Sequence, residues 1–159
     1  MNKEELISLL KDYKENKARL NIKLKELKMK RIQLKSYDDI DISLSTAYGI
    51  NQDIHSKNQI SDKVLRKVEQ NDMKRRQLQE EINELEKIVS DLREKVESVN
   101  DRLEALKYKE REILTAYYVE GRTAEDIGNK LYFQLFSQTR SDRHIQRIIE
   151  KATEKMINL

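Results

Sequence analysis

The longest pattern in the chain is a repeat of apolar residues, spaced alternately four and three positions apart, over about six heptads. It starts after Ser61 or Asp62, and only Asn71 and Arg75 interrupt it. Its apolar members are Val64, Val68, Leu78, Ile82, Leu85, Val89, Leu92, Val96, Val99, Leu103 and Leu106. A spacing that averages 3.5 residues keeps one stripe of a helix turned toward a partner helix. We therefore expect a helix from about residue 61 to 106 that takes part in a left-handed coiled coil.

A similar stripe predicts an earlier helix, from about residue 3 to 36. Its members are Leu6, Leu10, Tyr13, Leu20, Leu24, Leu27 and Leu34, with Lys17 and Arg31 as polar interruptions. Because one amphipathic helix cannot bury its stripe alone, we expect an antiparallel hairpin of the two helices, or a dimer built on the second. Residues 37 to 60 lack a helical period and predict a loop, either a flexible linker or a functional loop.

Three shorter helices are predicted in the last third of the chain. A first apolar stripe ends at Gly121, and Thr123 opens the next helix with Asp126 three positions later, in the form of a capping box. Ser141 is the predicted cap of a helix from 141 to 157. The apolar stripe of this last helix is Ile145, Ile148, Ile149, Ala152 and Met156. This layout is typical of a helix-turn-helix that binds DNA.

These patterns together predict an all-α fold. We expect a long coiled-coil helical hairpin over residues 1–106, followed by a small C-terminal helix-turn-helix domain over residues 107–159. The composition agrees, since 38% of the residues are charged and only 37% are hydrophobic. Helices that bury a narrow seam need less apolar surface than a compact globule of 159 residues.

The charges are distributed unevenly along the chain. Residues 1 to 36 carry eleven Lys and Arg against five acids, whereas residues 37 to 106 carry eleven against sixteen. We therefore expect the first helix to lie beside the acidic flanks of the second, formed by Glu80, Glu81, Glu84, Glu86 and Glu94. The alternative is that both sets are simply solvated helix faces.

No residue set suggests catalysis. The chain has no cysteine and two histidines, His55 and His144, neither with metal-ligand spacing to other donors. We expect no enzymatic activity, no metal and no cofactor. No run of about twenty apolar residues occurs, and the first residues lack a signal-peptide core. We expect no membrane partner and a cytoplasmic location.

The last predicted helix carries the candidate binding residues. Arg143, Arg147 and Lys151 lie opposite its apolar stripe, flanked by His144 and Gln146. Arginine can pair with guanine and glutamine with adenine in the major groove, and lysine suits phosphate. The residues predicted to contact double-stranded DNA are Arg122, Thr123, Lys130, Ser141, Arg143, His144, Gln146, Arg147 and Lys151. The alternative is a solvated face, since Asp142, Glu150 and Glu154 lie among them.

The C-terminal third resembles the fourth-region helix-turn-helix of sigma-70-type factors. It is more similar still to phage transcriptional activators of the ArpU and RinA kind. The matching residues are Glu110, Arg111, Glu112, Tyr117, Tyr118, Gly121, Glu125, Asp126, Ile127, the run Ser141–Arg147, and Ala152. The resemblance implies a sequence-specific regulator that activates late genes of a phage or prophage. It also implies a dimer or higher oligomer, contact with RNA polymerase, and a nucleoid-associated location in a bacterial host when bound.

One departure from this family is an insert at residues 132–140, where two or three residues are usual. It could lengthen either helix, form an extra turn, or pack Tyr132, Phe133 and Phe136 against a partner. Two other functions remain open from the sequence. The chain could be a coiled-coil assembly or adaptor protein, or a small subunit of a phage DNA-packaging machine. A ring of eight or more copies would favour packaging, and a dimer would favour the activator.

Overall fold

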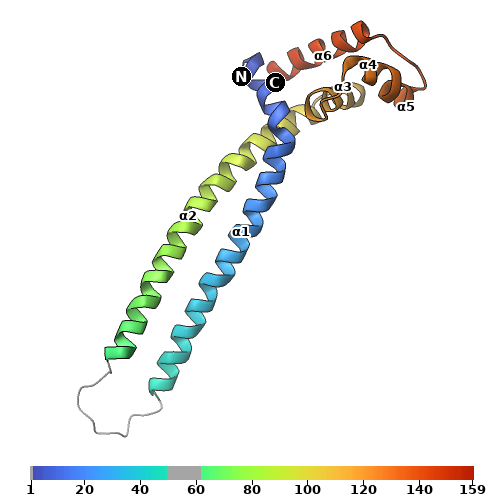
Figure 1. Cartoon of the computed structure of the whole chain (residues 1–159). Coiled ribbons are helices and arrows are strands. Elements are labelled where there is room, and N and C mark those ends of the chain that lie inside the picture. Colours follow the sequence, from blue (N-terminus) through green and yellow to red (C-terminus); the bar gives the residue numbers. More distant parts are fainter. Residues whose placement is uncertain (1, 50–61) are drawn as a thin grey trace, which may run out of the picture. The chain divides into compact units, whose positions relative to one another are not determined.

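A computed structural model describes residues 2–49 and 62–159, with side chains described for residues 2–37 and 66–159, and these residues contain helices and no strand. Two long helices come first, α1 (Lys3–Gly49) and α2 (Asp62–Glu104) (Figure 1). The all-helical prediction and the long N-terminal helix pair are confirmed. Along the described residues, no helix combines the length and the apolar character that crossing a bilayer requires.

Helix α1 continues well past its predicted end. The sequence predicted a helix over about 3–36 and a loop over 37–60, but α1 extends to Gly49. Residues 37–49 are therefore helical, and the rest of the predicted loop, with His55, lies outside the described residues. The reason is that Asp and Ser disfavour a helix only weakly, by roughly 0.5 kcal/mol each, whereas extending an existing helix needs no new nucleus. No proline or glycine lies between Lys3 and Gly49 to stop it.

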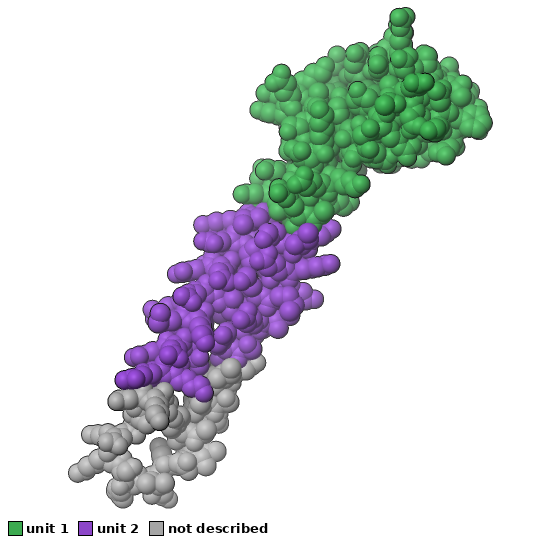
Figure 2. Space-filling model, in the orientation of Figure 1, with its two compact units in different colours: residues 1–20, 91–159 green, residues 21–90 purple. Residues whose placement is uncertain are grey.

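The chain folds into two compact units, which are described separately (Figure 2). Unit 1 comprises residues 1–20 and 91–159, and unit 2 comprises residues 21–90. The first twenty residues and the end of α2 therefore belong with the C-terminal helices. The predicted division after residue 106 stays a prediction, although the chain does turn there: α2 ends at Glu104, and Lys107 is extended with φ −64° and ψ 147°.

In unit 2 the two long helices pack through the predicted apolar stripes. Leu27 of α1 is buried, as are four apolar residues of α2, which are Leu78, Ile82, Leu85 and Val89. Lys30 forms an ion pair with Glu81, and Arg31 forms one with Glu86 at 2.6 Å. The predicted contact between basic α1 and the acidic flank of α2 is confirmed at these two pairs.

Among the described members of the stripe in α2, Leu92 is only half-buried and Val68 is exposed. Val68 is 38% exposed, although the heptad repeat assigns it to the same stripe as Leu78. A heptad repeat predicts which side of a helix a residue occupies, but burial also needs a partner side chain opposite, which the repeat does not specify.

Unit 1 has one continuous core that joins both ends of the chain. Leu6 and Leu10 from the start of α1 contribute to it, together with Val99 and Leu103 from the end of α2. The remaining buried members come from the C-terminal helices and include Ile113, Leu114, Ile127, Ile145, Ala152 and Met156. At the edge of this core, Tyr13 donates a hydrogen bond to the Asn100 side-chain oxygen. The predicted core residue Ile113 is buried, and Tyr117 and Tyr118 are half-buried.

Three helical runs follow α2 and form the C-terminal part of unit 1. The first is α3 (Tyr108–Leu114) and the π-helical turn η1 (Thr115–Val119), and it ends before Gly121, whose φ is +72°. The second joins α4 (Ala124–Asp126), the π-helical turn η2 (Ile127–Leu131) and α5 (Tyr132–Phe136). The third is α6 (Asp142–Ile157). Residues 132–136 of the predicted insert therefore lengthen the middle run, and residues 137–141 connect it to α6.

Candidate functional site

Helix α6 has one buried side and one exposed side, as its sequence pattern predicts. Ile145, Ala152 and Met156 are 0% exposed and Ile149 is 5% exposed, because α6 packs on α3, α4 and η2. Ile148 is only half-buried. These contacts hold the helix in one rotational setting, so its opposite side is presented outward.

Four of the predicted site residues lie exposed on that opposite side. We call them the outer face of α6: Arg143, Gln146, Arg147 and Lys151. Arg143, Arg147 and Lys151 are spaced four apart, so their side chains project from neighbouring turns. No ion pair among the described residues involves any of these three cations. Glu150 and Glu154 are exposed on the same side, so the excess of positive charge lies toward the N-terminal half of α6.

Ser141 occupies the N-cap position of α6, but its side chain makes no capping hydrogen bond. The backbone N–H of Arg143 instead donates to the Asp142 carboxylate at 2.7 Å. The predicted N-cap position of Ser141 is therefore confirmed, without a hydrogen bond from its side chain. An ionised carboxylate is a strong acceptor and is favoured at a helix N-terminus, which agrees with this contact of Asp142.

The predicted capping box at Thr123 forms on one side only. Thr123 Oγ1 accepts a hydrogen bond from the Asp126 N–H at 3.2 Å. The Asp126 carboxylate does not reach back to Thr123 but pairs with Lys130 at 2.7 Å, and this hydrogen bond lowers the pKa of Asp126. The shorter side chain of Asp, compared with the usual Glu, accounts for the missing return bond.

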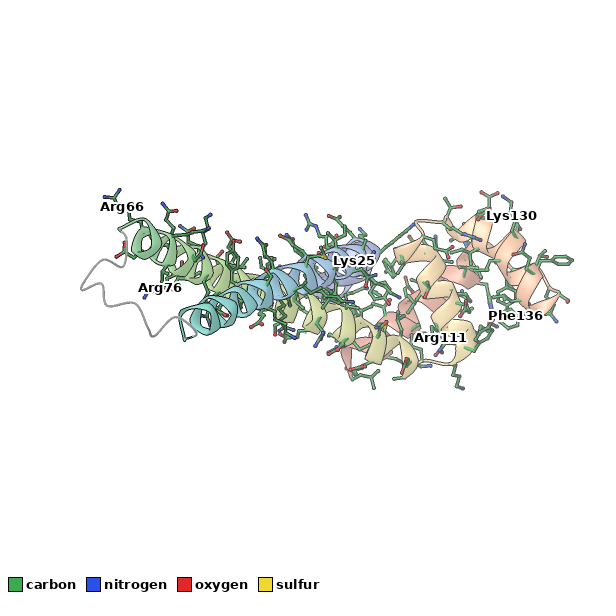
Figure 3. All side chains as sticks on the ribbon, turned by 90° about the horizontal axis from the view of Figure 1, so that it is seen from below. Lys25, Arg66, Arg76, Arg111, Lys130 and Phe136 are labelled. Carbon is green, nitrogen blue, oxygen red and sulfur yellow. The ribbon has the colours of Figure 1, made fainter. Side chains whose placement is uncertain are left out.

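The three residues outside α6 that were predicted to contact DNA, Arg122, Thr123 and Lys130, each interact with a residue close to them in the chain. Arg122 pairs with Glu120 at 2.9 Å, and Lys130 with Asp126. Within the described part of the chain, no hydrogen bond or ion pair joins Arg122, Thr123 or Lys130 to α6. In Figure 3, Lys130 and Phe136 lie on opposite edges of the C-terminal helices. The structure brings together the α6 residues, but not these three with them.

His144 lies in a cluster that the sequence did not predict. We call it the Tyr132 cluster: Lys109, Tyr132, Phe136, Arg140 and His144. Tyr132 is only 2% exposed, and its ring packs on Phe136 with centroids 4.9 Å apart and edge-on to His144 at 6.4 Å. Lys109 Nζ lies 4.6 Å from the Tyr132 ring centre and hydrogen-bonds to its hydroxyl. The sequence feature that could have indicated this cluster is the aromatic pair Tyr132 and Phe136, which lie four positions apart in the insert.

The connection between α5 and α6 is held by backbone contacts. The Arg140 N–H donates to the Gly128 carbonyl at 3.1 Å. A Cβ atom on Gly128 would lie 2.2 Å from the Arg140 carbonyl oxygen, so the close approach requires glycine. Ser137 ends α5 in the left-handed region, with φ 55° and ψ 29°. These contacts fix how α6 is placed relative to α5, as a shorter turn between the two helices would.

Replacing Ser137 with glycine is expected to stabilise the protein by about 0.5–1 kcal/mol, because a serine side chain is strained in the left-handed region. The free energy of unfolding should be measured by urea denaturation. Ser137→Ala is the matched control and should give no such gain. A Ser137→Gly variant less stable than the parent would contradict this assignment of strain.

The two ends of the C-terminal helices are joined by an ion pair. Lys155, in the last turn of α6, pairs with Glu110, in the first turn of α3. Each charge also suits the dipole of its own helix end. The hydrogen bond from Lys155 lowers the pKa of Glu110 and outweighs burial, which acts in the opposite direction.

Lys155→Met is expected to cost about 1 kcal/mol at pH 7, since Lys155 is half exposed and the pair is partly screened. A depressed carboxyl pKa contributes stability above its usual value of 4.5, and this is lost as the pH falls through the folded-state value. The stability difference between parent and variant should therefore be constant from pH 7 to about 5 and close below about pH 4.5. A difference that does not shrink at all as the pH falls below 4.5, measured by thermal unfolding, would exclude the ion pair as its cause.

Metal binding and comparison with known proteins give no further indication of what the site residues do. Among the described side chains, no group of three or more His, Asp or Glu is arranged to hold a metal ion. Comparison of the chain with protein-family models, with curated protein sequences and with solved structures finds no match.

Proposed function

We propose that this protein is a sequence-specific DNA-binding transcription regulator. Residues 107–159 act as a helix-turn-helix domain, and α6 enters the major groove as the recognition helix. The observation that carries the proposal is the division of α6 into a buried isoleucine side and an outer face whose arginines form no ion pair with any described residue. A recognition helix needs both sides, because the buried side sets its orientation and the outer side supplies hydrogen-bond donors to the bases.

The position of the charges along α6 supports the same proposal. Recognition helices contact base edges mainly through their N-terminal residues. The outer face is most basic at that end, where Arg143 and Arg147 lie, whereas Glu150 and Glu154 follow further along. Each arginine can donate two hydrogen bonds to guanine, and Gln146 can pair with adenine. Lys151 is suited to a backbone phosphate.

The long helices are proposed to form a coiled coil that brings copies of the protein together. Three exposed apolar residues of α1 lie on one side of unit 2: Ile22 at 62%, Met29 at 66% and Ile32 at 53% exposed. Their spacing of seven and three is that of a second helical stripe. A dimer or higher oligomer would cover it and allow two recognition helices to read paired half-sites. The resemblance to phage activators further suggests contact with RNA polymerase.

The proposal is tested by selecting duplexes from a random pool with the purified full-length protein. A shared motif should emerge, and fluorescence anisotropy should show that the selected duplex binds at least about a thousandfold more tightly than unrelated DNA. Affinity should fall steeply with salt because bound counterions are released. Absence of a motif, with equal or no binding to all duplexes, would contradict sequence-specific reading.

The exposed apolar stripe of α1 also favours a second candidate, a coiled-coil assembly or adaptor protein. The same stripe would then receive another protein instead of a second copy. Mass measured in solution separates the candidates. A dimer that selects a DNA motif supports the regulator, a ring of eight or more supports a packaging subunit, and a monomer without DNA binding supports the adaptor.

A further inference from the structure

The Tyr132 cluster gathers positive charge from three parts of unit 1. Lys109 comes from α3, Arg140 from the connection before α6, and His144 from the first turn of α6. The Arg140 guanidinium lies 5.8 Å from the Tyr132 ring centre, on which Lys109 also stacks. In the ranges 2–37 and 66–159, no carboxylate forms an ion pair with Lys109 or Arg140. These cations are thus held close together without a compensating anion.

Contacts within the protein fix the positions of Lys109 and Arg140. Lys109 hydrogen-bonds to the Tyr132 hydroxyl, and Arg140 donates to the Gln138 side-chain oxygen at 2.8 Å. The backbone of Arg140 is fixed against Gly128. Because their side chains are already ordered, an anion that binds here loses little affinity to side-chain ordering.

Burial and three positive charges act on the His144 imidazole. Burial lowers the pKa of His144, and so do the charges of Arg140, Lys109 and Arg147. Burial raises the pKa of Tyr132, but the hydrogen bonds and charges of Lys109 and Arg140 outweigh it and lower the pKa overall. The Tyr132 ring, which packs edge-on to His144, thus lies beside two cations. A bound anion would offset the repulsion from these cations, which is one of the causes that favour the neutral form of His144.

We propose that Lys109, Arg140 and His144 together bind one phosphate group beside the recognition helix. The inference rests on the proposed function for the source of this phosphate, since a DNA duplex lying along α6 would supply one from its backbone. Lysine and arginine donate charge-assisted hydrogen bonds to phosphate oxygens, and a protonated His144 adds another donor. Binding is then accompanied by uptake of a proton on the His144 imidazole, and it strengthens as the pH falls from about 7.5 to 6.

The first experiment measures duplex binding by Arg140→Gln and Lys109→Met. Each change should weaken binding about tenfold for selected and unrelated duplexes alike, because a phosphate contact carries no sequence information. Each should also reduce the slope of log affinity against log salt by about one. Lys11→Met, which removes an exposed lysine of α1 in the same unit, is the control and should leave both unchanged. Unchanged affinity and slope in both cluster variants would overturn the proposal.

The second experiment follows the His144 ring signals by NMR through a pH titration of the full-length protein. The titration is run alone, with inorganic phosphate, and with a selected duplex. A rise of about one pKa unit with the duplex only identifies backbone phosphate as the ligand, and the same rise with inorganic phosphate identifies a site for free phosphate. His144→Gln assigns the signals.

The outcomes separate this inference from the proposed function. If the protein binds no DNA but inorganic phosphate raises the His144 pKa, the phosphate site stands and the DNA-binding function fails. If a sequence motif is selected but no phosphate source shifts His144, the function stands and the phosphate site fails. If neither binding nor a shift occurs, both fail.

Discussion

A variant carrying both Arg143→Ala and Arg147→Ala is expected to lose about 2–6 kcal/mol of binding free energy for its selected duplex, because each arginine that pairs with a base contributes about 1–3 kcal/mol. At the lower figure, affinity falls roughly thirtyfold. Both side chains are exposed and contribute nothing to the buried side of α6, so the variant should fold normally. Its sequence preference should also relax at the contacted positions.

Anisotropy with selected and unrelated duplexes at one salt concentration measures this loss. The matched control combines Lys11→Ala with Arg93→Ala, which removes two exposed cations of unit 1 away from α6. Lys151→Ala provides a second comparison, since loss of a phosphate contact weakens all duplexes equally. If the double α6 variant lost no more than the charge control, base reading by this face would be excluded.

Gly128→Ala is expected to destabilise unit 1 by about 3 kcal/mol, at the upper end of the cost of overpacking. Its new Cβ would lie 2.2 Å from the Arg140 carbonyl oxygen and 3.4 Å from the Ile145 side chain. The first of these atoms belongs to the backbone, so relief requires the connection before α6 to move. That movement would also displace Arg140 and the start of α6.

Urea denaturation followed by near-ultraviolet circular dichroism reports on this change, because Tyr108, Tyr117, Tyr118 and Tyr132 all lie in the C-terminal helices. Asn129→Ala, at the exposed neighbouring position, is the control and should change stability by less than about 0.5 kcal/mol. A Gly128→Ala variant as stable as this control would show that the connection does not need its close backbone approach.

Several elements of the protein are determined by local sequence. The outer and buried sides of α6 follow from residue spacing alone, since a regular helix converts a period of 3.6 into two faces. Gly121 and Thr123 end one helical run and begin the next through their own backbone and side-chain chemistry. The charges of the two long helices also predicted that these helices meet, but the ion pairs of Lys30 and Arg31 join residues far apart in the chain.

Other elements depend on local interactions that the pattern of apolar and polar residues did not reveal. Local composition predicted a loop at residues 37–49, but propagation from the preceding helix carried α1 through it. Ser141 is the N-cap residue of α6, but the side chain that accepts a hydrogen bond at this helix end is that of Asp142, from the Arg143 N–H. Arg122 and Lys130 were candidates by charge, yet each pairs with a nearby carboxylate.

The sequence by itself determined helix α6, the face of α6 that is buried and the residues that remain outside, because these depend on spacing within a single segment. Only the tertiary structure decided that Leu6 and Leu10 share a core with α6, and that Lys109, Arg140 and His144 meet around Tyr132. Residues far apart in the chain come together through packing and backbone contacts such as Gly128 with Arg140. A local pattern carries no information about such distant partners, which is why the candidate phosphate site could not be read from it.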